Sequence, residues 1–490
     1  MLVELNTEHV KKELEKGKLE RIVTSNDSFV EDILDVMIDN KNHEMFKEAF
    51  KDYRKHKDVI PLEKIMLLSV SAKMKQNTSV TDIPYAITSP ELLAKIGHNI
   101  IEDEKDAGLM SEGVIREIVS RYHACELIFG YNKYADAIID KYSYRNQIKR
   151  HILDCTHVTV NYSNYNYEYA EITKEKGTPE KGYKLATIRG ITETGGIIEE
   201  IRFAPINMHD MGLSREMILS SKHLKAGDIL LEDRGFIDIE SFRELSSKGI
   251  TVIIPAKQNM DIYKVAVETA IDKNEWTKHP NEKRKGQNIA IVPNMEEYWI
   301  PEDEKVKKPE NARKMGYGIN CCVIRFDVNK NKEILEDKGE GNIAVIGKNK
   351  KYAYAVIISN DRKMSASQII RAYEQRPEIE EDYRQLKDFW KLEDFKSTKY
   401  IMILFHIVMT LIGYLYYQIY KDMEEGEEYI GKSLPVILKN YKQKSKNQRF
   451  IIYVDKYYGI FNFSDIFEIY GNAKQKIKEK IMPKIKEYIS

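Results

Sequence analysis

The sequence predicts a mixed α/β protein in which a helical N-terminal region precedes a β-rich core, and three observations lead to this prediction. In the first 145 residues, apolar side chains recur at spacings of three and four, as they do in amphipathic helices. From about residue 148, runs such as HILDCTHVTVNY and TVIIPAK are rich in β-branched residues, which favours strands. Helical spacing returns near residue 373, in the stretch YEQRPEIEEDYRQLK.

A chain of 490 residues is long enough for several structural units, and we expect five regions. Residues 1–145 form a helical domain, whose short helices and basic turns suit a DNA-binding or assembly module as well as a plain helical domain. Residues 146–257 alternate strands and helices and form the first part of an α/β core. Residues 258–350 form a β-rich insertion, residues 351–425 complete the core with the helix that opens in KMSASQIIRAYEQ, and residues 426–490 form a basic helical C-terminal region.

Charge balance, cysteine content and the N-terminal sequence limit what kind of protein this can be. Lys and Arg together number 77, as do Asp and Glu, so any contact with nucleic acid must come from local patches. The four cysteines form no CxxC pair, which indicates reduced thiols and a cytoplasmic location. The charged N-terminus lacks the apolar run of a signal peptide.

One apolar segment, IMILFHIVMTLIGYLYYQIY at residues 401–420, contains no Asp, Glu, Lys or Arg and is long enough to span a bilayer. The same segment carries His406, Thr410 and Gln418, and the rest of the chain is rich in charge. We therefore expect a buried helix of a soluble protein and no membrane partner.

The stretch from residue 373 to residue 387 places four chemically useful side chains on one helical face. Tyr373, Arg376, Glu380 and Lys387 are separated by offsets of 3, 7 and 14, which keeps them within an arc of ~60°. Such a face is also compatible with solvated side chains in ion pairs four residues apart. The rest of the chain decides between these interpretations.

Two aspartates upstream give the carboxylate of this face its partners. Asp154 follows apolar residues in HILDC, and Asp233 ends the apolar run DILLED. Each alone suits a turn or a helix cap, but together with Glu380 they supply hard oxygen ligands from three separate elements. Mg²⁺ prefers such ligands, and two ions about 4 Å apart can catalyse an in-line phosphodiester displacement.

The remaining members of the face suit phosphate binding. Arg376 offers a bidentate fork and Lys387 a point charge, while Tyr373 offers a hydroxyl. Arg234, directly after Asp233, shapes the turn and is a further candidate for a phosphate contact.

These residues resemble the Tyr-x2-Arg-x3-Glu-x6-Lys signature of prokaryotic insertion-sequence transposases of the insertion-sequence-four family. Asp154 in LDCT and Asp233 in LLEDRGF are similar to the two catalytic aspartates of that family, and GYKL at residues 182–185 resembles its second-strand motif. The resemblance covers roughly residues 60 to 420.

The resemblance implies an RNase H-like catalytic core interrupted by a β-rich insertion. It further implies Mg²⁺-dependent cleavage of double-stranded DNA at terminal inverted repeats and strand transfer into target DNA, by a homodimer in the prokaryotic cytoplasm that joins the nucleoid when bound to DNA. Two Mg²⁺ ions, with Mn²⁺ as a substitute, would be held by Asp154, Asp233 and Glu380. Tyr373, Arg376 and Lys387 would contact phosphates near the cleaved end.

Some relatives flip a base onto a tryptophan of the insertion, and Trp276 and Trp299 lie in that region here. Either could stack on a base, although an aromatic side chain in a β domain more often belongs to the core. Two alternative functions stay open. One is a structure-selective Mg²⁺-dependent nuclease without strand transfer, and the other is a DNA-binding protein without catalysis.

Overall fold

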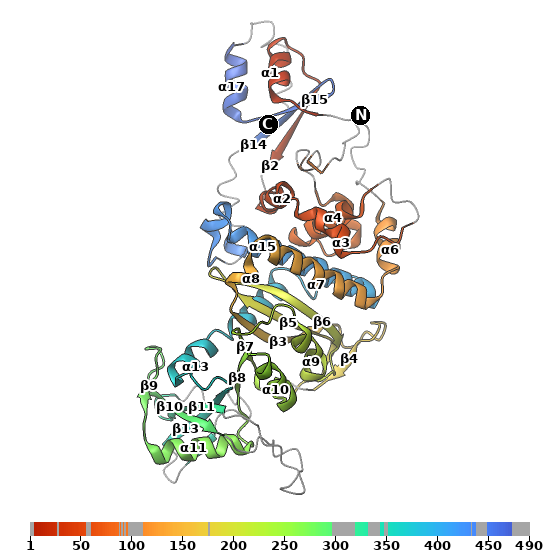
Figure 1. The fold of residues 1–490 in the computed structure, drawn as a ribbon. Helices are drawn as coiled ribbons and strands as arrows, with labels where there is room; N and C mark the ends of the chain where they lie inside the picture. Colours follow the sequence, from red (N-terminus) through yellow and green to blue (C-terminus); the bar gives the residue numbers. More distant parts are fainter. Residues whose placement is uncertain are drawn as a thin grey trace. The chain divides into compact units, whose positions relative to one another are not determined.

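The fold was analysed in a computed structural model, which divides into two compact units (Figure 1). The first unit contains residues 1–138, 166–168 and 385–490, and the second contains residues 139–165 and 169–384. The structure describes residues 4–26, 29–54, 60–87, 89, 92, 95–96, 111–174, 177–295, 319–331, 344–346, 351–432, 434–437 and 448–472.

Five strands form the centre of the second unit. Strands β3 (Arg150–Thr159), β5 (Glu180–Ile191) and β6 (Gly196–Pro205) pair as an antiparallel meander. Strands β7 (Ile229–Glu232) and β8 (Thr251–Pro255) run parallel to β3, which gives the order β6–β5–β3–β7–β8. The predicted mixed α/β class is therefore confirmed.

Helices connect the parallel strands and bury the sheet. Helix α9 (Asp210–Ser220) lies between β6 and β7 in sequence, and α10 (Ile239–Ser247) lies between β7 and β8 (Figure 1). Both contribute to one large apolar cluster that also contains Leu153, Leu230 and Val252 from the strands. Burial on both faces explains why these strands are continuously apolar in sequence.

The predicted insertion continues the same sheet on the far side of β8. Strand β13 (Tyr352–Ser359), from the predicted second part of the core, pairs antiparallel with β8, and strands β11, β10 and β9 of the predicted insertion follow in order. The insertion also contains a helix, α11 (Asp261–Lys273), whose buried residues follow the spacing of three and four. The other strands are β4 (Glu171–Thr173), β9 (Thr277–Lys278), β10 (Gln287–Met295), β11 (Ile319–Asp327) and β12 (Ala344–Ile346).

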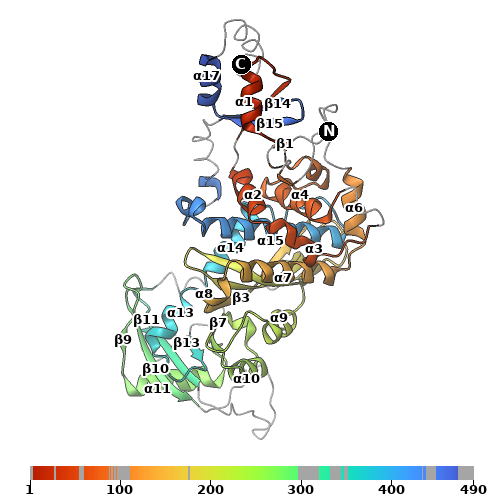
Figure 2. The same ribbon diagram turned by 45° about the horizontal axis from the view of Figure 1, so that its top comes forward.

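The first unit is built around helix α15 (Tyr400–Lys421), which packs against α2, α4 and α6 (Figure 2). Its length and composition alone would allow it to cross a membrane, but every side chain from residue 403 to residue 421 is buried. The prediction of a buried helix is thus confirmed. The helices of the N-terminal region are α1 (Thr7–Glu15), α2 (Phe29–Asp39), α3 (Phe46–Ala49), α4 (Leu62–Met74), α6 (Glu112–Ser120), α7 (Ala124–Lys141) and α8 (Tyr144–Gln147).

Tyrosine side chains fix α15 in this unit. The hydroxyl groups of Tyr134 and Tyr416 lie 2.6 Å apart and are buried. The Trp390 ring packs edge-on against Tyr414 with 5.6 Å between centroids. The hydroxyl group of a buried tyrosine needs a hydrogen-bond partner. Pairing with tyrosines of neighbouring helices therefore allows α15 to be both buried and rich in tyrosine.

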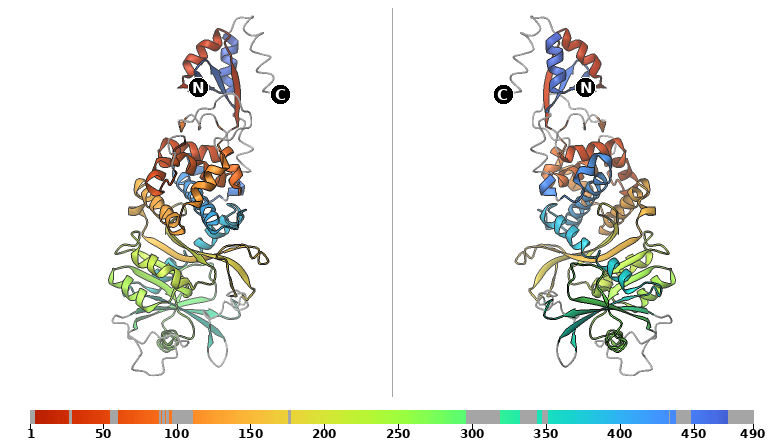
Figure 3. Two further views of the ribbon diagram at one scale, coloured as in Figure 1. Left: turned by 90° about the vertical axis from the view of Figure 1, so that its right-hand side faces the viewer. Right: turned by 90° about the vertical axis from the view of Figure 1, so that its left-hand side faces the viewer.

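The two ends of the chain meet in a four-stranded sheet with the order β1–β15–β14–β2 (Figure 3). The expectation of wholly helical regions at residues 1–145 and 426–490 is wrong here, because each region contributes two strands. Pairing partners more than 400 residues apart leave no local signal. The elements are β1 (Glu4–Leu5), β2 (Arg21–Asn26), β14 (Gln448–Val454), β15 (Tyr457–Phe461) and α17 (Phe463–Asn472).

A buried ion cluster connects β3, β6 and the start of β7. His151 is 1% exposed, and its Nδ1 atom lies 2.6 Å from Oε2 of Glu199 while its Nε2 atom lies 3.5 Å from Oδ2 of Asp228. Burial opposes the charged imidazole, but the two carboxylates outweigh it and raise the pKa of His151 to about 9. The imidazolium therefore compensates two buried carboxylates.

This cluster predicts a pH-dependent stability difference between the wild type and His151→Gln. A raised folded-state pKa means that the contribution of His151 is complete below its ordinary pKa of 6.5 and is lost as pH rises through about 9. At pH 6 we expect the free energy of unfolding of the variant, measured by urea denaturation, to be lower than that of the wild type by on the order of 3 kcal/mol. At pH 9.5 this difference should be smaller. An equal difference at both pH values would contradict the imidazolium assignment.

Candidate active site

The parallel pairing of β3 with β7 brings the two predicted aspartates together. Leu153 is paired with Glu232 at the end of the register, so the next residues are Asp154, within β3, and Asp233, directly after β7. Successive strand residues face opposite sides, which separates Asp233 from its buried neighbour. Glu232 lies in the interior, where burial raises its pKa to about 8.

The guanidinium of Arg376 contacts all three predicted acids. Its Nη2 atom donates to Oδ2 of Asp154 at 2.9 Å and lies 4.0 Å from Oδ2 of Asp233. Its Nη1 atom forms an ion pair with Glu380. Asp154 within β3, Asp233 directly after β7, Arg376 in a turn and Glu380 in α14 thus form one cluster.

Burial and charge act in opposite directions on Asp154. The residue is 8% exposed, and burial raises its pKa to about 7, against the lowering effect of Arg376 and of the Cys155 backbone amide. The neighbouring carboxylates of Asp233 and Glu380 raise the pKa further. The single positive charge of Arg376 therefore does not balance the three acids of this cluster.

The expectation that Tyr373 to Lys387 lie on one face of a single helix is wrong, because a turn at residues 374–377 interrupts the helix. Helix α13 (Ala366–Tyr373) begins with a capping box between Ser365 and Gln368, and α14 (Glu378–Asp388) begins after Pro377. Proline disfavours helical conformation in the residue before it and cannot donate a backbone hydrogen bond. Arg376 consequently lies in the turn, while Glu380 lies in the first turn of α14.

Two residues that sequence analysis missed attach α14 to the sheet. The hydroxyl of Tyr383 donates to the backbone carbonyl of Asp154 at 2.9 Å and lies 2.6 Å from the hydroxyl of Thr187. Arg189, on β5 and 3% exposed at its side chain, pairs with Asp382 and with Glu378 at 3.1 Å. The run DYR at residues 382–384 was the available signal, because it places an acid and a phenol close to the predicted ligand Glu380.

A glycine makes room for this attachment. A Cβ atom on Gly196 of β6 would lie 2.2 Å from Cζ of Arg189, far closer than packed atoms approach. Any other residue at this position would push the guanidinium away from Asp382.

The other predicted residues have different environments. Lys387, near the end of α14, forms an ion pair with Glu393 at 3.4 Å. Arg234, after Asp233, has a buried Nη1 atom without a hydrogen-bond partner among the described residues. The ring of Trp276 is partly buried and packs against Arg325, whose Cζ lies 4.2 Å from the ring centroid. Trp299 lies outside the described residues.

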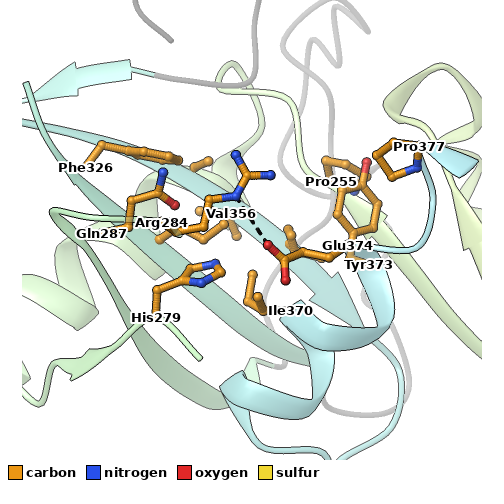
Figure 4. Close-up of a pocket in the computed structure, with 13 residues that line it drawn as sticks. Pro255, His279, Arg284, Gln287, Phe326, Val356, Ile370, Tyr373, Glu374 and Pro377 are labelled. Carbon is orange, nitrogen blue, oxygen red and sulfur yellow. Dashed lines mark hydrogen bonds and ion pairs between the residues drawn. The ribbon is translucent and has the colours of Figure 1, made fainter. Parts of the chain in front are cut away.

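Tyr373 lines a cavity of about 310 Å³ between the insertion strands and the end of α13 (Figure 4). Pro255 and Pro377 lie beside its ring, and the ion pair of Arg284 with Glu374, at 3.3 Å, crosses the cavity. Burial raises the pKa of Tyr373, so its hydroxyl keeps its proton and acts as a donor.

The three acids match a divalent cation in ligand type. All are carboxylates, the oxygen donors that Mg²⁺ prefers, and their oxygens already surround one cationic group. In the described part of the chain, no group of three or more His, Cys, Asp or Glu side chains is arranged for metal coordination. The guanidinium of Arg376 lies between the acids, where a metal ion would have to compete with it.

A mixed sheet that carries acids on two neighbouring strands, with a third acid on a helix, is compatible with acid-dependent phosphoryl transfer. Residues 143–416 match the protein family described as Transposase DDE domain. The chain belongs to this family, which confirms the predicted class of DDE transposase. Curated proteins give no match.

Among solved structures, the chain is similar to a piggyBac transposase in a synaptic complex with hairpin DNA. The sequence identity is 10%, the TM-score is 0.39, and the similarity covers 87% of this chain and 83% of that one.

The contact between Tyr383 and β3 predicts a measurable stability loss. Tyr383→Phe removes one hydroxyl and leaves the buried carbonyl of Asp154 and the hydroxyl of Thr187 without this partner, so we expect a loss of roughly 1–2 kcal/mol in urea unfolding. Thr187→Val serves as the second arm of a double-mutant cycle. Because the groups share one network, the two losses should be non-additive, and strict additivity would argue against the shared hydrogen bonds.

Proposed function

We propose that this protein is a DNA transposase of the insertion-sequence-four family, which cleaves double-stranded DNA at terminal inverted repeats and joins the freed 3′ hydroxyl groups to target DNA. The observation that carries this proposal is the convergence of Asp154, Asp233 and Glu380 on one cationic group. The strand order β6–β5–β3–β7–β8, with an antiparallel meander followed by two parallel strands, supports an RNase H-like core.

The acids are proposed as ligands of two Mg²⁺ ions, for which Mn²⁺ can substitute. Bound metal ions would supply an activated attacking oxygen and stabilise the leaving oxygen in an in-line displacement. Asp154 is suited to this role because its carboxylate lies in a partly desolvated site on β3, where charge interactions are strong.

The flanking residues are proposed as phosphate ligands. Tyr373 keeps its proton and offers a donor, while Arg376 and Lys387 offer positive charge. Arg234, with an unsatisfied buried Nη1 atom, is a further candidate. For Trp276, the contact with Arg325 favours a packing role in this conformation, so a base would have to displace the guanidinium from the ring.

The proposal extends to the state of the active protein. A homodimer would hold two element ends together, and a cytoplasmic enzyme associated with the nucleoid is consistent with the four free cysteines. The large buried surface of α15 supports a protein that acts without a membrane partner.

End cleavage tests the proposed ligands. With a labelled duplex that carries the inverted repeats flanking the gene, in Mg²⁺, we expect Asp154→Asn, Asp233→Asn and Glu380→Gln each to lower the cleavage rate at least about 100-fold, or ~2.7 kcal/mol. Glu381→Gln is the matched control, because Glu381 is an exposed neighbour on α14 that pairs with Arg384. Full activity of any one ligand variant would remove that residue from the site.

The same reaction distinguishes a transposase from a nuclease on the same fold. A supercoiled target plasmid added to the cleaved ends should yield joined products if strand transfer occurs. Cleavage without joined products would favour the structure-selective nuclease, and binding without cleavage would favour a catalytically inactive derivative.

The position of Arg376 predicts how its removal affects cation binding. In Arg376→Ala the three acids lose their shared counter-ion, so the metal-free variant should melt at a lower temperature and Mg²⁺ should bind about tenfold more tightly, or ~1.4 kcal/mol. Thermal unfolding against Mg²⁺ concentration measures both effects. Arg384→Ala is the control, since Arg384 pairs with Glu381 elsewhere on α14. Weaker Mg²⁺ binding in Arg376→Ala would show that the guanidinium assists the cation instead of competing with it.

A further inference from the structure

A second, smaller cavity lies in the first compact unit, apart from the acidic cluster. It encloses about 60 Å³, several times the roughly 10–15 Å³ that one water molecule needs. The end of α4, helix η2 (Val80–Tyr85) and the N-terminal half of α15 contribute to its wall. None of its described lining residues is acidic, and the polar ones include Lys73, Ser79, Arg116, Lys396, Ser397 and His406.

Lys73 gives this cavity a buried positive charge. Lys73 is 3% exposed. Its Nζ atom donates hydrogen bonds to the backbone carbonyls of Asn77 at 3.1 Å and Thr78 at 3.3 Å. Burial lowers the pKa of Lys73 to about 8, although the charges of Asp82 and Asp394 act in the opposite direction. No carboxylate among the described residues forms an ion pair with it, and a buried ammonium without such a partner is costly.

His406 adds an unpartnered acceptor. The residue is 4% exposed, and its Nε2 atom lies 2.9 Å from the backbone carbonyl of Lys391, so Nε2 carries the proton. Its Nδ1 atom has no hydrogen-bond partner in the described part of the chain and therefore presents a lone pair. A ligand that satisfies both Lys73 and His406 must combine negative charge with a proton to donate.

The mouth of the cavity carries two further cations. Arg116 lies 3.6 Å from Glu112, and Lys396 lies 2.5 Å from Asp394. Both pairs are exposed, and exposed ion pairs contribute little free energy. Either cation can therefore turn to a bound anion at small cost.

We propose that this cavity binds one protonated phosphate group, held by Lys73 and His406 inside and by Arg116 and Lys396 at its mouth. Hydrogenphosphate has both the negative charge and the P–OH donor that these groups require. The phosphate group belongs either to free inorganic phosphate or to a terminal phosphate monoester of DNA, because a phosphodiester within the backbone carries no P–OH. Only the second source rests on the proposed function.

Thermal unfolding of the full chain in phosphate tests this proposal, with sulfate and chloride at equal ionic strength as references. Sulfate controls for the general stabilisation by excluded salts and lacks the proton. In the wild type, phosphate should raise the midpoint in a saturable way, and more than sulfate does. Lys73→Met should abolish the saturable part, and Arg116→Ala should weaken phosphate binding at least about fivefold.

Lys399→Ala is the matched control, because Lys399 is exposed, follows Lys396 closely and pairs with Glu168 at 2.6 Å without lining the cavity. Its phosphate response should equal that of the wild type. If Lys73→Met fails to fold, Arg116→Ala carries the test. A wild-type response no larger than in sulfate, or an unchanged response in both variants, would overturn the proposal.

Binding of a duplex that ends in a 5′-phosphate, compared at several salt concentrations with the same duplex ending in a 5′-hydroxyl, identifies the source of the phosphate. If the group is a terminal phosphate of DNA, the 5′-phosphate duplex should bind more tightly than the 5′-hydroxyl duplex. Arg116→Ala should then lower the salt slope of the 5′-phosphate duplex by about one, and free phosphate should compete with it. If it is free phosphate, Arg116→Ala and Lys399→Ala should bind DNA equally. Loss of the proposed transposase function would appear as absent end cleavage with an intact phosphate response, so the two failures are distinguishable.

Discussion

Carboxylates on neighbouring strands repel one another unless a cation lies between them, and this constraint governs the second compact unit. The register of β3 with β7 places Asp154 beside Asp233, and α14 adds Glu380. Arg376 supplies the compensating charge from the turn at Pro377. Without that break, Arg376 and Glu380 would merely share a helix face, and an exposed pair of that kind contributes little.

The acidic cluster keeps its geometry only if α14 is held in one position, and buried polar contacts hold it there. Arg189 is buried with Asp382, and Tyr383 binds the backbone of the same strand residue whose carboxylate faces Arg376. Buried charges are costly unless fully paired, so this arrangement favours one position of α14 over its alternatives. A shift of the helix would leave Arg189 and Asp382 uncompensated as well as separating Glu380 from the aspartates.

Local patterns predicted the acids and their strands but not the contacts that assemble them. Asp154 and Asp233 follow apolar runs that are visible in sequence, and the mixed α/β class follows from the alternation of strands and helices. The pairing of β2 with β14 could not be predicted, because it joins residues more than 400 positions apart without a shared motif. Pro377 is a sequence signal for a turn, but the helical spacing on both sides of it favoured the prediction of one continuous helix. Residues 296–318, which include Trp299, lie outside the described structure.

A net charge of zero conceals local imbalances that decide what each unit can bind. In the acidic cluster, three acids surround one guanidinium, so a phosphate backbone would be repelled there until further positive charge arrives. In the first unit the imbalance has the opposite sign, because Lys73 is buried without a carboxylate partner among the described residues. The proposed metal site follows from the first imbalance and the proposed phosphate site from the second. Equal numbers of acidic and basic residues allow both imbalances to coexist without a large field of either sign.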